Sequence, residues 1–286
     1  MEGYRIIVGI KWVPNTQAVR FDPKTGTLIR QGVPAIINPQ DLQAIEMALR
    51  LRDRYGGEVI VVTMAPPPAV QGLEHAIGMG ADRAILVTDR SFAGADTLAT
   101  SYVLASAINK VEREMGRVDL AVFGQETIDS STAHIGAQVA SWLGWPYIYY
   151  VKEASLEDGR LRATRQLEDS IEEFEAALPA VISVLAKALK PRHVSLLHKL
   201  RAKTERPIIT WTNKDLGLDT RCVGLKGSPT IVAKVTYLPE VPRLKRVIKA
   251  DNPREAARWL LRSLLRDEKT RDVVLKALWG ERIAKG

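Results

Sequence analysis

Short apolar runs alternate with helix-like segments through the first 150 residues, and this alternation restricts the fold more than any other feature of the chain. Four runs are β-branched and almost continuously apolar, as strands buried on both faces are: YRIIVGIKWV, EVIVVTM, RAILVT and VDLAVFG. Between them, residues 39–55, 69–79 and 96–115 carry apolar residues at helical spacing. The repeated strand–helix–strand order predicts an α/β fold with a mostly parallel sheet and right-handed crossovers.

Two stretches depart from this order. The segment FDPKTGTLIRQGVPAIIN has a glycine-bearing turn between two extended pieces, which predicts a hairpin outside the sheet. After Trp145, the segment GRLRATRQLEDSIEEFEAALPAVISVL alternates polar and apolar residues and then becomes apolar before Leu185. This pattern predicts an antiparallel pair followed by a buried strand, so we expect the sheet to be mixed at one edge.

The charge of the chain is unevenly distributed. Residues 1–186 carry 17 Lys and Arg against 23 Asp and Glu, whereas residues 187–286 carry 24 against 10. The basic residues are interleaved with Leu, Val and Trp at helix-like spacing and are not clustered with stacking aromatics. This pattern favours a protein partner over nucleic acid.

Composition excludes several other classes. No apolar run approaches the roughly 18 residues that cross a bilayer, and the start MEGYRIIVGIKWV lacks the apolar region of a signal peptide, so we expect a soluble cytoplasmic protein. The single Cys222 cannot form an internal disulfide, no Cys/His cluster has zinc spacing, and His193 and His198 are interpreted as surface residues. Scarce Asn, Gln and Cys with plentiful Arg and Glu indicate a thermophile.

The segment VFGQETIDSSTAHIGA, residues 122–137, lies where a parallel strand ends, which is where open α/β sheets bind ligands. Gly124 lets the backbone pass close to a ligand, and Ser130, Ser131 and Thr132 can offer hydroxyls and helix-start N–H groups to a phosphate. Capping of the next helix by Ser130 or Ser131 is an equally open alternative. Asp129 would repel a phosphate, so we assign it to a sugar hydroxyl or a backbone amide.

Common catalytic and nucleotide motifs are absent. There is no GxxxxGK[ST] sequence, which argues against P-loop phosphoryl transfer. IGMGADR has two of the three dinucleotide-fold glycines and precedes a strand, so we interpret it as a helix C-cap and turn. No serine, histidine and acid arrangement can be defended, and we assign no catalytic residue and no metal ligand.

The chain loses compact patterning beyond residue 186. The stretch KPRHVSLLHKLRAKTERPIITWTNKDLG has little periodicity, and such segments are functional or disordered. Asn252 and Pro253 then begin a helix whose apolar stripe contains Ala257, Leu260 and Leu261. That stripe needs a cover, either its own domain or a partner.

Seven segments, in their order and spacing, resemble the small (beta) subunit of electron transfer flavoproteins, including the subgroup associated with flavin-based electron bifurcation. They are VGIKWVPNT, GTLIRQGVPAIINPQDLQAIEMALRL, AIGMGADRAILVTD, FAGADTLATSYVLASAI, VFGQETIDSSTAHIGAQVASWLGWP, LPAVISV and KPRHVSLLHKLRAK. The resemblance covers nearly the whole chain. It implies an adenine-nucleotide alpha-hydrolase-like (Rossmann-like) fold with an antiparallel edge and a C-terminal helical arm that embraces an alpha subunit in a heterodimer.

The resemblance also implies functional residues, carried over by position. The nucleotide-binding residues would be Gly9, Lys11, Asn38, Pro39, Gln40, Asp41, Met64, Gly124, Gln125, Thr127, Asp129, Ser130, Ser131, Thr132, Ala133 and Ile135. A recognition loop for partner dehydrogenases would span about residues 191–203, with Leu196 as its apolar anchor and Pro191, Arg192, Leu197 and Lys199 beside it. We therefore divide the chain into a nucleotide- or flavin-binding domain (1–186), a recognition loop (187–210) and a basic C-terminal segment with the arm (211–286).

Two functions follow from the resemblance. In a bifurcating protein the site holds FAD, which takes hydride from NADH and sends one electron through the alpha-subunit FAD to a quinone and the other to ferredoxin. In an ordinary member it holds structural AMP, and electrons come from acyl-CoA dehydrogenases. The segments GTLIRQGVP and GADTLATS favour bifurcation. Attachment to a membrane through a larger complex is left open, with no direct insertion.

One departure from the bifurcating pattern concerns the run after Asp129, which is Gly-Asp-Thr-Ala-Gln in that subgroup and Ser130 to His134 here. Ser131 removes a negative charge near a pyrophosphate, and His134 would alter the surroundings of the flavin. An alternative from another class is a solitary nucleotide-binding regulator, which would need neither a recognition loop nor an arm.

Overall fold

The structure is a computed structural model that describes residues 3–15, 20–21, 28–29, 34–205, 208–230, 247, 249–266 and 268–279. The chain divides into two compact units, Met1–Val232 and Ala233–Gly286. Each unit is described by itself.

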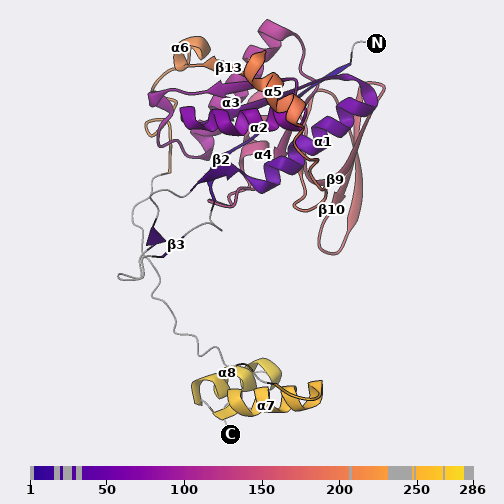
Figure 1. The fold of residues 1–286 in the computed structure, drawn as a ribbon, viewed down its shortest axis with the longest axis vertical. Coiled ribbons are helices and arrows are strands. Elements are labelled where there is room, and N and C mark those ends of the chain that lie inside the picture. The colour runs from indigo at the N-terminus through magenta and orange to yellow at the C-terminus, as the bar shows by residue number, and fades with distance from the viewer. Residues whose placement is uncertain are drawn as a thin grey trace. The chain divides into compact units, whose positions relative to one another are not determined.

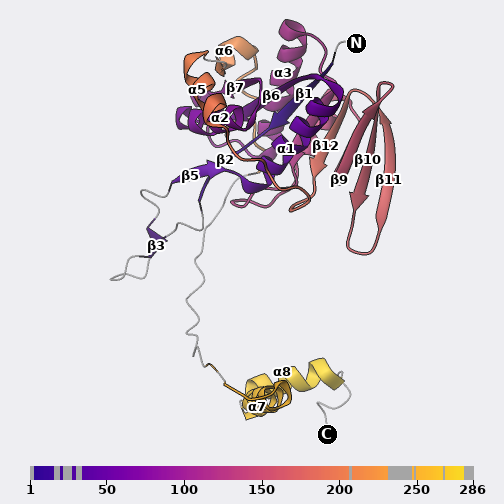
Figure 2. The same cartoon turned by 45° about the vertical axis from the view of Figure 1, so that its right-hand side comes forward.

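The first unit is built on a nine-stranded sheet with the strand order β11-β10-β9-β12-β8-β1-β6-β7-β13 (Figure 1). Its strands are β1 (Tyr4–Gly9), β6 (Gly57–Met64), β7 (Arg83–Val87), β8 (Leu120–Gly124), β9 (Tyr147–Glu157), β10 (Arg160–Gln166), β11 (Ile171–Ala177), β12 (Ala180–Val184) and β13 (Ile208–Trp211). Six neighbouring pairs in this order are parallel, namely β9–β12, β12–β8, β8–β1, β1–β6, β6–β7 and β7–β13. At the other edge, β10 is antiparallel to both β9 and β11. The predicted α/β fold with a mixed edge is confirmed, and Figure 2 shows that edge as a meander of β9, β10 and β11.

Helices cover both faces of the sheet. Helices α1 (Pro39–Tyr55) and α2 (Val70–Met79) pack with the core cluster on one face, and α3 (Thr97–Met115) and α4 (Ile135–Leu143) pack with the cluster on the other. Successive residues of β1 alternate between the clusters, because side chains of a strand point to opposite faces: Ile6 and Val8 join the first and Ile7 the second. The apolar runs were therefore interpreted correctly as strands buried on both faces.

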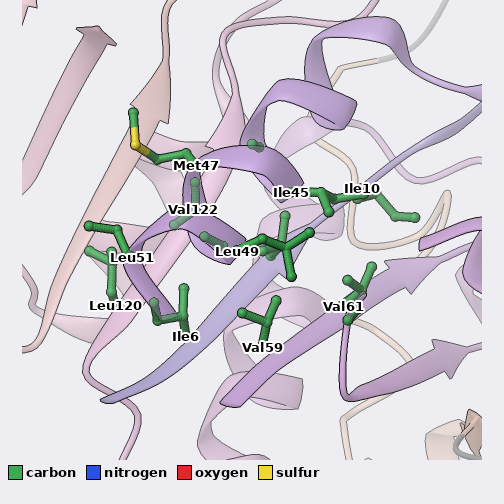
Figure 3. Packing of buried hydrophobic residues seen from close by; sticks show 14 of the residues in the cluster. Ile6, Ile10, Ile45, Met47, Leu49, Leu51, Val59, Val61, Leu120 and Val122 are labelled. Carbon is green, nitrogen blue, oxygen red and sulfur yellow. The ribbon is translucent and has the colours of Figure 1, made fainter. Parts of the chain in front are cut away.

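Figure 3 shows how α1 covers the sheet. Ile45 and Leu49 of α1 lie over side chains from β1, β6 and β8, and all of these residues are buried. Full burial of one such side chain contributes about 1.5–3 kcal/mol, so this layer is a large part of the stability of the unit. It also holds the N-terminus of α1 near the ends of β1 and β8, where the candidate site lies.

The predicted hairpin outside the main sheet is confirmed. Strand β2 (Trp12–Pro14) pairs antiparallel with β5 (Ala35–Ile37), and farther out β3 (Arg20–Phe21) pairs antiparallel with β4 (Leu28–Ile29). The predicted glycine turn lies outside the described residues.

The stretch from residue 187 to 216 contains more regular structure than its sequence pattern indicates. It forms α5 (Leu196–Thr204), β13 and the short helix α6 (Asn213–Leu216), and β13 pairs in parallel with β7 as the last strand of the sheet. The sheet thus continues past residue 186. Three leucines of α5 are exposed, so the helix has no apolar stripe facing the core that a periodicity search could find.

The second unit contains the helices α7 (Pro253–Arg266) and α8 (Glu268–Trp279), which pack against each other. The predicted start of the arm is confirmed: Asn252 Oδ1 accepts a hydrogen bond from Glu255 N at 3.0 Å, and Pro253 is the first helical residue. Trp259, Leu260 and Leu261 of α7 are exposed. Within the described part of the chain, no helix is both long and apolar enough to cross a membrane.

Candidate functional site

A cleft of about 1020 Å³ lies at the carboxyl ends of the central strands. The last residues of four adjacent parallel strands line it, namely Gly9, Met64, Val87 and Gly124, and these belong to β1, β6, β7 and β8. The strand ends form one wall, and the loops and helix starts that follow them form the others. This is the edge where α/β sheets bind ligands, as the sequence predicted.

Asp41 is the buried carboxylate of this cleft. Its Oδ2 accepts a hydrogen bond from Lys11 N at 2.7 Å, and its Oδ1 accepts one from Asn38 Nδ2 at 3.0 Å. Burial raises the pKa of Asp41 to about 7, because it outweighs the opposing effect of these hydrogen bonds and of Gly124 N–H. Asp41 is therefore protonated more easily than an ordinary aspartate.

Asn38 holds the loop after β8 in place. Its Nδ2 donates to the carbonyl of Glu126 at 2.8 Å, and its Oδ1 accepts from Ile128 N at 3.2 Å. Gln40 adds a third hydrogen bond to this loop, because its Oε1 accepts from Glu126 N at 3.0 Å. Asn38 occupies the N-cap position of α1, but its side chain makes no capping hydrogen bond.

The loop from Gln125 to His134 presents several small hydroxyls. Thr127 Oγ1 and Ser130 Oγ share a hydrogen bond of 2.8 Å. Asp129 makes an ion pair with Lys11 Nζ at 2.7 Å, so an ammonium group is a partner that the sequence did not predict. Burial alone would raise the pKa of Asp129, but Lys11 and the hydrogen bonds from Thr127 and the backbone together outweigh it, and the pKa is lowered. Lys11 and Asp129 thus neutralise each other beside the cleft.

The start of α4 is open to the cleft. The N-cap residue is His134, it makes no side-chain capping bond, and Ser130 and Ser131 lie before the helix, so the serine-capping alternative is wrong. Ser131 Oγ instead donates to the carbonyl of Thr127 at 3.2 Å. His134, Ile135 and Gly136 line the cleft. The first N–H groups of α4 therefore face the cleft without a capping side chain, which is the arrangement that binds anions.

The start of α3 and residue 230 also line the cleft. Asp96 caps α3 by accepting from Ala99 N at 3.0 Å, and its other oxygen accepts from Thr230 Oγ1 at 2.7 Å. Burial alone would raise the pKa of Asp96, but these bonds lower it. Thr97, Thr100 and Thr230 add hydroxyls to the lining, and Phe92, Leu104, Phe123 and Ile135 add apolar surface.

Arg90 stands in the 3-10 turn Arg90–Phe92 that follows β7, and it lines the cleft. Its side chain is exposed and makes no hydrogen bond or ion pair with any residue that the structure describes. Lys11, the other lysine or arginine of the lining, is paired with Asp129. Arg90 therefore brings to the cleft a guanidinium that is not paired with any carboxylate among the described residues.

The structure brings most of the predicted cofactor residues together. Eleven of the sixteen line the cleft, namely Gly9, Lys11, Asp41, Met64, Gly124, Gln125, Thr127, Ser130, Thr132, Ala133 and Ile135. The other five, Asn38, Pro39, Gln40, Asp129 and Ser131, stand behind or beside the lining. Five further lining residues were not predicted from the sequence: Arg90, Asp96, Thr97, Thr100 and Thr230. Asp96 was identified as the start of a helix, and its place after a parallel strand was the signal that could have found it.

The predicted docking residues lie in and before α5. Leu196 and Leu197 are 82% and 77% exposed, and Lys199 is also exposed. Pro191 and Arg192 are half-buried, and Arg192 is bonded to Glu46 and Asp53. Among the described residues, no group of three or more His, Cys, Asp or Glu side chains could hold a metal ion.

Comparison with known proteins identifies relatives of this chain. The family described as electron transfer flavoprotein domain matches residues 25–216. Protein FixA of Bradyrhizobium diazoefficiens is 43% identical over 256 residues, covering 87% of this chain and 88% of FixA. The caffeyl-CoA reductase-Etf complex subunit CarD of Acetobacterium woodii is 44% identical over 229 residues, covering 80% and 86%. The electron transfer flavoprotein subunit beta of Clostridium acetobutylicum is 41% identical over 260 residues, covering 91% and 97%.

Proposed function

This chain belongs to the electron transfer flavoprotein family, in its beta-subunit branch, and we propose that it binds FAD in the cleft and works as a bifurcating subunit. Paired with an alpha subunit, it would take part in passing electrons from NADH to a high-potential and a low-potential acceptor. The observation that carries the proposal is the size and composition of the cleft at the ends of β1, β6, β7 and β8.

The cleft fits an adenine dinucleotide better than AMP. Ligand pockets commonly have about 300–1,000 Å³, and this one, at about 1020 Å³, is at the upper end of that range. FAD adds a second phosphate, a ribityl chain and a flavin ring to the AMP moiety, whereas AMP alone would leave much of the volume to water. The apolar lining from Phe92, Leu104 and Phe123 suits a flat ring system.

The polar residues of the cleft suit a pyrophosphate. The uncapped start of α4 offers N–H groups, Thr127 and Ser130 offer hydroxyls, and Arg90 offers an unpaired guanidinium. Thr97 and Thr100, at the start of α3, can hydrogen-bond to sugar or ribityl hydroxyls. These residues would bind and orient the cofactor, and in this proposal no residue of the chain performs a covalent or acid–base step.

When bound, FAD would supply the redox chemistry, accepting a hydride from NADH and passing one electron by way of the alpha-subunit FAD to a quinone and the other to ferredoxin. The contribution of this chain is to exclude water and to set distances and electrostatics around the ring. Docking of partner proteins would use the exposed leucines of α5, and assembly with the alpha subunit would use the arm formed by α7 and α8.

The test is the cofactor content of the purified heterodimer. The protein is denatured, and the released FAD and AMP are quantified by chromatography against the protein concentration. Two FAD per heterodimer, with bleaching of the flavin absorbance by NADH, would support the proposal. One FAD and one AMP would refute it in favour of the ordinary function. A colourless monomer that does not bind the alpha subunit would point to the solitary regulator.

We also propose a thermophilic source for this chain. Its ion pairs form a connected network, which gains more at high temperature than isolated surface pairs do. The members of this network are Glu46, Arg50, Arg52, Asp53, Asp82 and Arg192. A thermal unfolding midpoint of the heterodimer above about 90 °C would agree with this, and one in the mesophilic range of about 45–65 °C would contradict it.

A further inference from the structure

We propose that Glu46 is a positioning residue for partner docking, because its buried carboxylate holds the chain segment that leads into the docking helix α5. This inference rests on the proposed docking function of α5. It concerns a residue of α1 that neither lines the cofactor cleft nor reaches the docking surface.

Glu46 is an unusual residue for its place. It lies in the middle of α1 and is 3% exposed, in a helix whose buried residues are mostly apolar. A buried carboxylate is costly unless charged partners and hydrogen bonds compensate it. The partners of Glu46 should therefore explain why a carboxylate stands there.

Those partners are two arginines, and one of them belongs to the segment before α5. Glu46 Oε2 accepts hydrogen bonds from Arg192 Nε at 2.8 Å and from the backbone N of Arg192 at 3.1 Å. Glu46 Oε1 accepts from Arg50 Nε at 2.7 Å. Because the same carboxylate oxygen binds both the backbone and the side chain of Arg192, it fixes the position and the orientation of that residue.

Burial alone would raise the pKa of Glu46, but Arg192 and Arg50 outweigh it, and the pKa is lowered. The carboxylate is thus ionised at neutral pH. Replacing it by a neutral amide would remove the charge that holds Arg192.

Neighbouring contacts show that α1 binds this segment along one side. Gln43 Oε1 accepts from Leu189 N at 3.3 Å, and Asp53 Oδ2 accepts from Arg192 Nη1 at 2.8 Å. Gln125, from the cofactor loop, accepts from Ala186 N at 2.9 Å. Of the three α1 residues, Glu46 makes the most contacts with the segment and is the most deeply buried.

The segment then joins α2, where α5 begins. Ser195 N donates to the carbonyl of Gly78 at 2.9 Å, and Val194 Cγ1 would lie 2.6 Å from a Cβ at Gly78. The close approach at this glycine and the Glu46 contacts together set how α5 lies on α2. As a result Leu196, Leu197 and Leu200 are 82%, 77% and 58% exposed.

The guanidinium of Arg192 is directed toward Glu46 and Asp53. We therefore assign Arg192, predicted from the resemblance as a docking residue, to anchoring the segment. Leu196 and Leu197 remain the residues that we propose to touch a partner.

The inference is tested by amide hydrogen exchange of the heterodimer carrying Glu46→Gln, which keeps the size of the side chain and removes its charge. We expect peptides from residues 189–204 to exchange about tenfold faster, while peptides from β8 and α3 keep their rates. Arg50→Gln is the matched control, because Arg50 also bonds to Glu46 but belongs to α1 and not to the segment. Arg50→Gln should change the exchange rates of residues 189–204 by less than about twofold. Unchanged exchange in Glu46→Gln would overturn the inference.

A second readout separates positioning from general stability. The second readout uses a partner dehydrogenase that exchanges electrons with the unaltered heterodimer. With it, Glu46→Gln should raise the apparent KM about tenfold and leave kcat unchanged, since fewer molecules are competent to dock. Arg192→Gln should have a similar effect, and the double variant should be no worse than either single one. Additive effects would overturn the inference. If Glu46→Gln does not fold, Arg192→Gln carries both measurements, because Arg192 is half-exposed.

Leu196→Ala distinguishes this inference from the proposed docking function. If Leu196→Ala weakens electron exchange and Glu46→Gln does not, the positioning role of Glu46 is wrong and the docking function stands. If Leu196→Ala has no effect, the docking function of α5 is wrong, whatever Glu46→Gln does to hydrogen exchange.

Discussion

Oδ1 of Asp41 occupies the space that a side chain at Gly124 would need, since a Cβ atom there would lie 2.3 Å from it. The end of β8 and the start of α1 can meet only because residue 124 has no side chain. The sequence analysis explained Gly124 by the approach of a ligand, whereas in the structure the close neighbour is a carboxylate of the protein.

Gly124→Ala should therefore displace Asp41 and the loop that Asn38 and Gln40 hold. We expect the variant heterodimer to lose most of its nucleotide at the beta-subunit site, measured as nucleotide released per heterodimer. The control is Gly144→Ala, which has a φ of 69° and no atom within 4 Å of its Cβ. It should lower stability by about 1 kcal/mol and keep the nucleotide. Normal nucleotide content in Gly124→Ala would show that the contact does not matter for binding.

Asp41 should make stability depend on pH. Its pKa rises from the ordinary aspartate value of 3.8 to about 7 in the folded chain, so the folded state binds the proton more tightly than the unfolded state does. Its contribution to the free energy of unfolding is therefore greatest below about pH 4 and falls as the pH rises to about 7. We expect Asp41→Asn to be less stable throughout, because its amide N–H₂ would face the donors of Lys11 and Asn38, but to lose this slope.

The measurement is urea unfolding of the chain without cofactor at a series of pH values, with the variant and the unaltered chain compared at each. If the free energy of unfolding changed equally with pH in Asp41→Asn and in the unaltered chain, the carboxyl of Asp41 would have an ordinary pKa. Asp96→Asn serves as a control, because the pKa of Asp96 is lowered in the folded chain and its contribution to the free energy of unfolding therefore has the opposite pH dependence. That contribution is present at high pH and is lost as the pH falls into the acid range.

The sheet could be predicted from sequence because its central strands carry their signal locally. Each buried strand is a continuous apolar run, and each intervening helix has a stripe and a stop, so the order of β1, α1 and β6 follows from pattern alone. β13 could not be found this way, because it has four residues and its pairing with β7 depends on contacts far apart in sequence. Helix α5 was also not predicted, because its leucines are exposed and do not form an apolar stripe that faces the core.

The candidate site was predictable only in part. The loop after β8 stands out by its run of hydroxyl residues, and family resemblance added residues from β1, α1 and β6. Thr230 is held at the cleft by hydrogen bonds to Asp96, 134 residues away, and no local pattern contains these contacts. The roles of Asn38 and Arg192 were carried over from the family resemblance and that of Asp129 was assigned by residue type, whereas the contacts of all three come from the fold.

Arg90 should bind a phosphate of the cofactor. Arg90→Met removes the charge and keeps much of the length of the side chain, and we expect it to weaken FAD binding about tenfold, in line with the roughly 1.5–3 kcal/mol of a hydrogen bond to a charged group. Arg83→Met is the matched control, because Arg83 stands at the other end of β7 and makes a half-exposed pair with Glu58. Titration of the cofactor-free protein with FAD gives both affinities. Equal affinities for the two variants would place the phosphates away from Arg90.

Leu196→Ala should slow electron exchange with the partner dehydrogenase and leave the bound nucleotide unchanged. An exposed leucine that becomes buried on docking contributes about 1.5–3 kcal/mol, so we expect at least a tenfold rise in the apparent KM. Ile171→Ala is the control, since Ile171 is 66% exposed but lies on β11, at the edge of the sheet opposite β13. Loss of nucleotide in Leu196→Ala would mean that α5 supports the cofactor site instead.

The arm should bind the alpha subunit through its apolar side. In α7 the arginines 254, 258, 262 and 266 recur every fourth residue and form one charged row, whereas Leu260 and Leu261 belong to the apolar stripe of the same helix and are exposed in the second unit. Leu260→Ala with Leu261→Ala should weaken the heterodimer by at least tenfold, as measured by titration calorimetry. The matched variant is Arg258→Ala with Arg262→Ala, which removes as many side chains from the charged side and should have a smaller effect that depends on salt. If the arginine substitutions weaken the heterodimer more than the leucine substitutions do, the arm binds by charge. Its leucines must then be covered by something other than the alpha subunit.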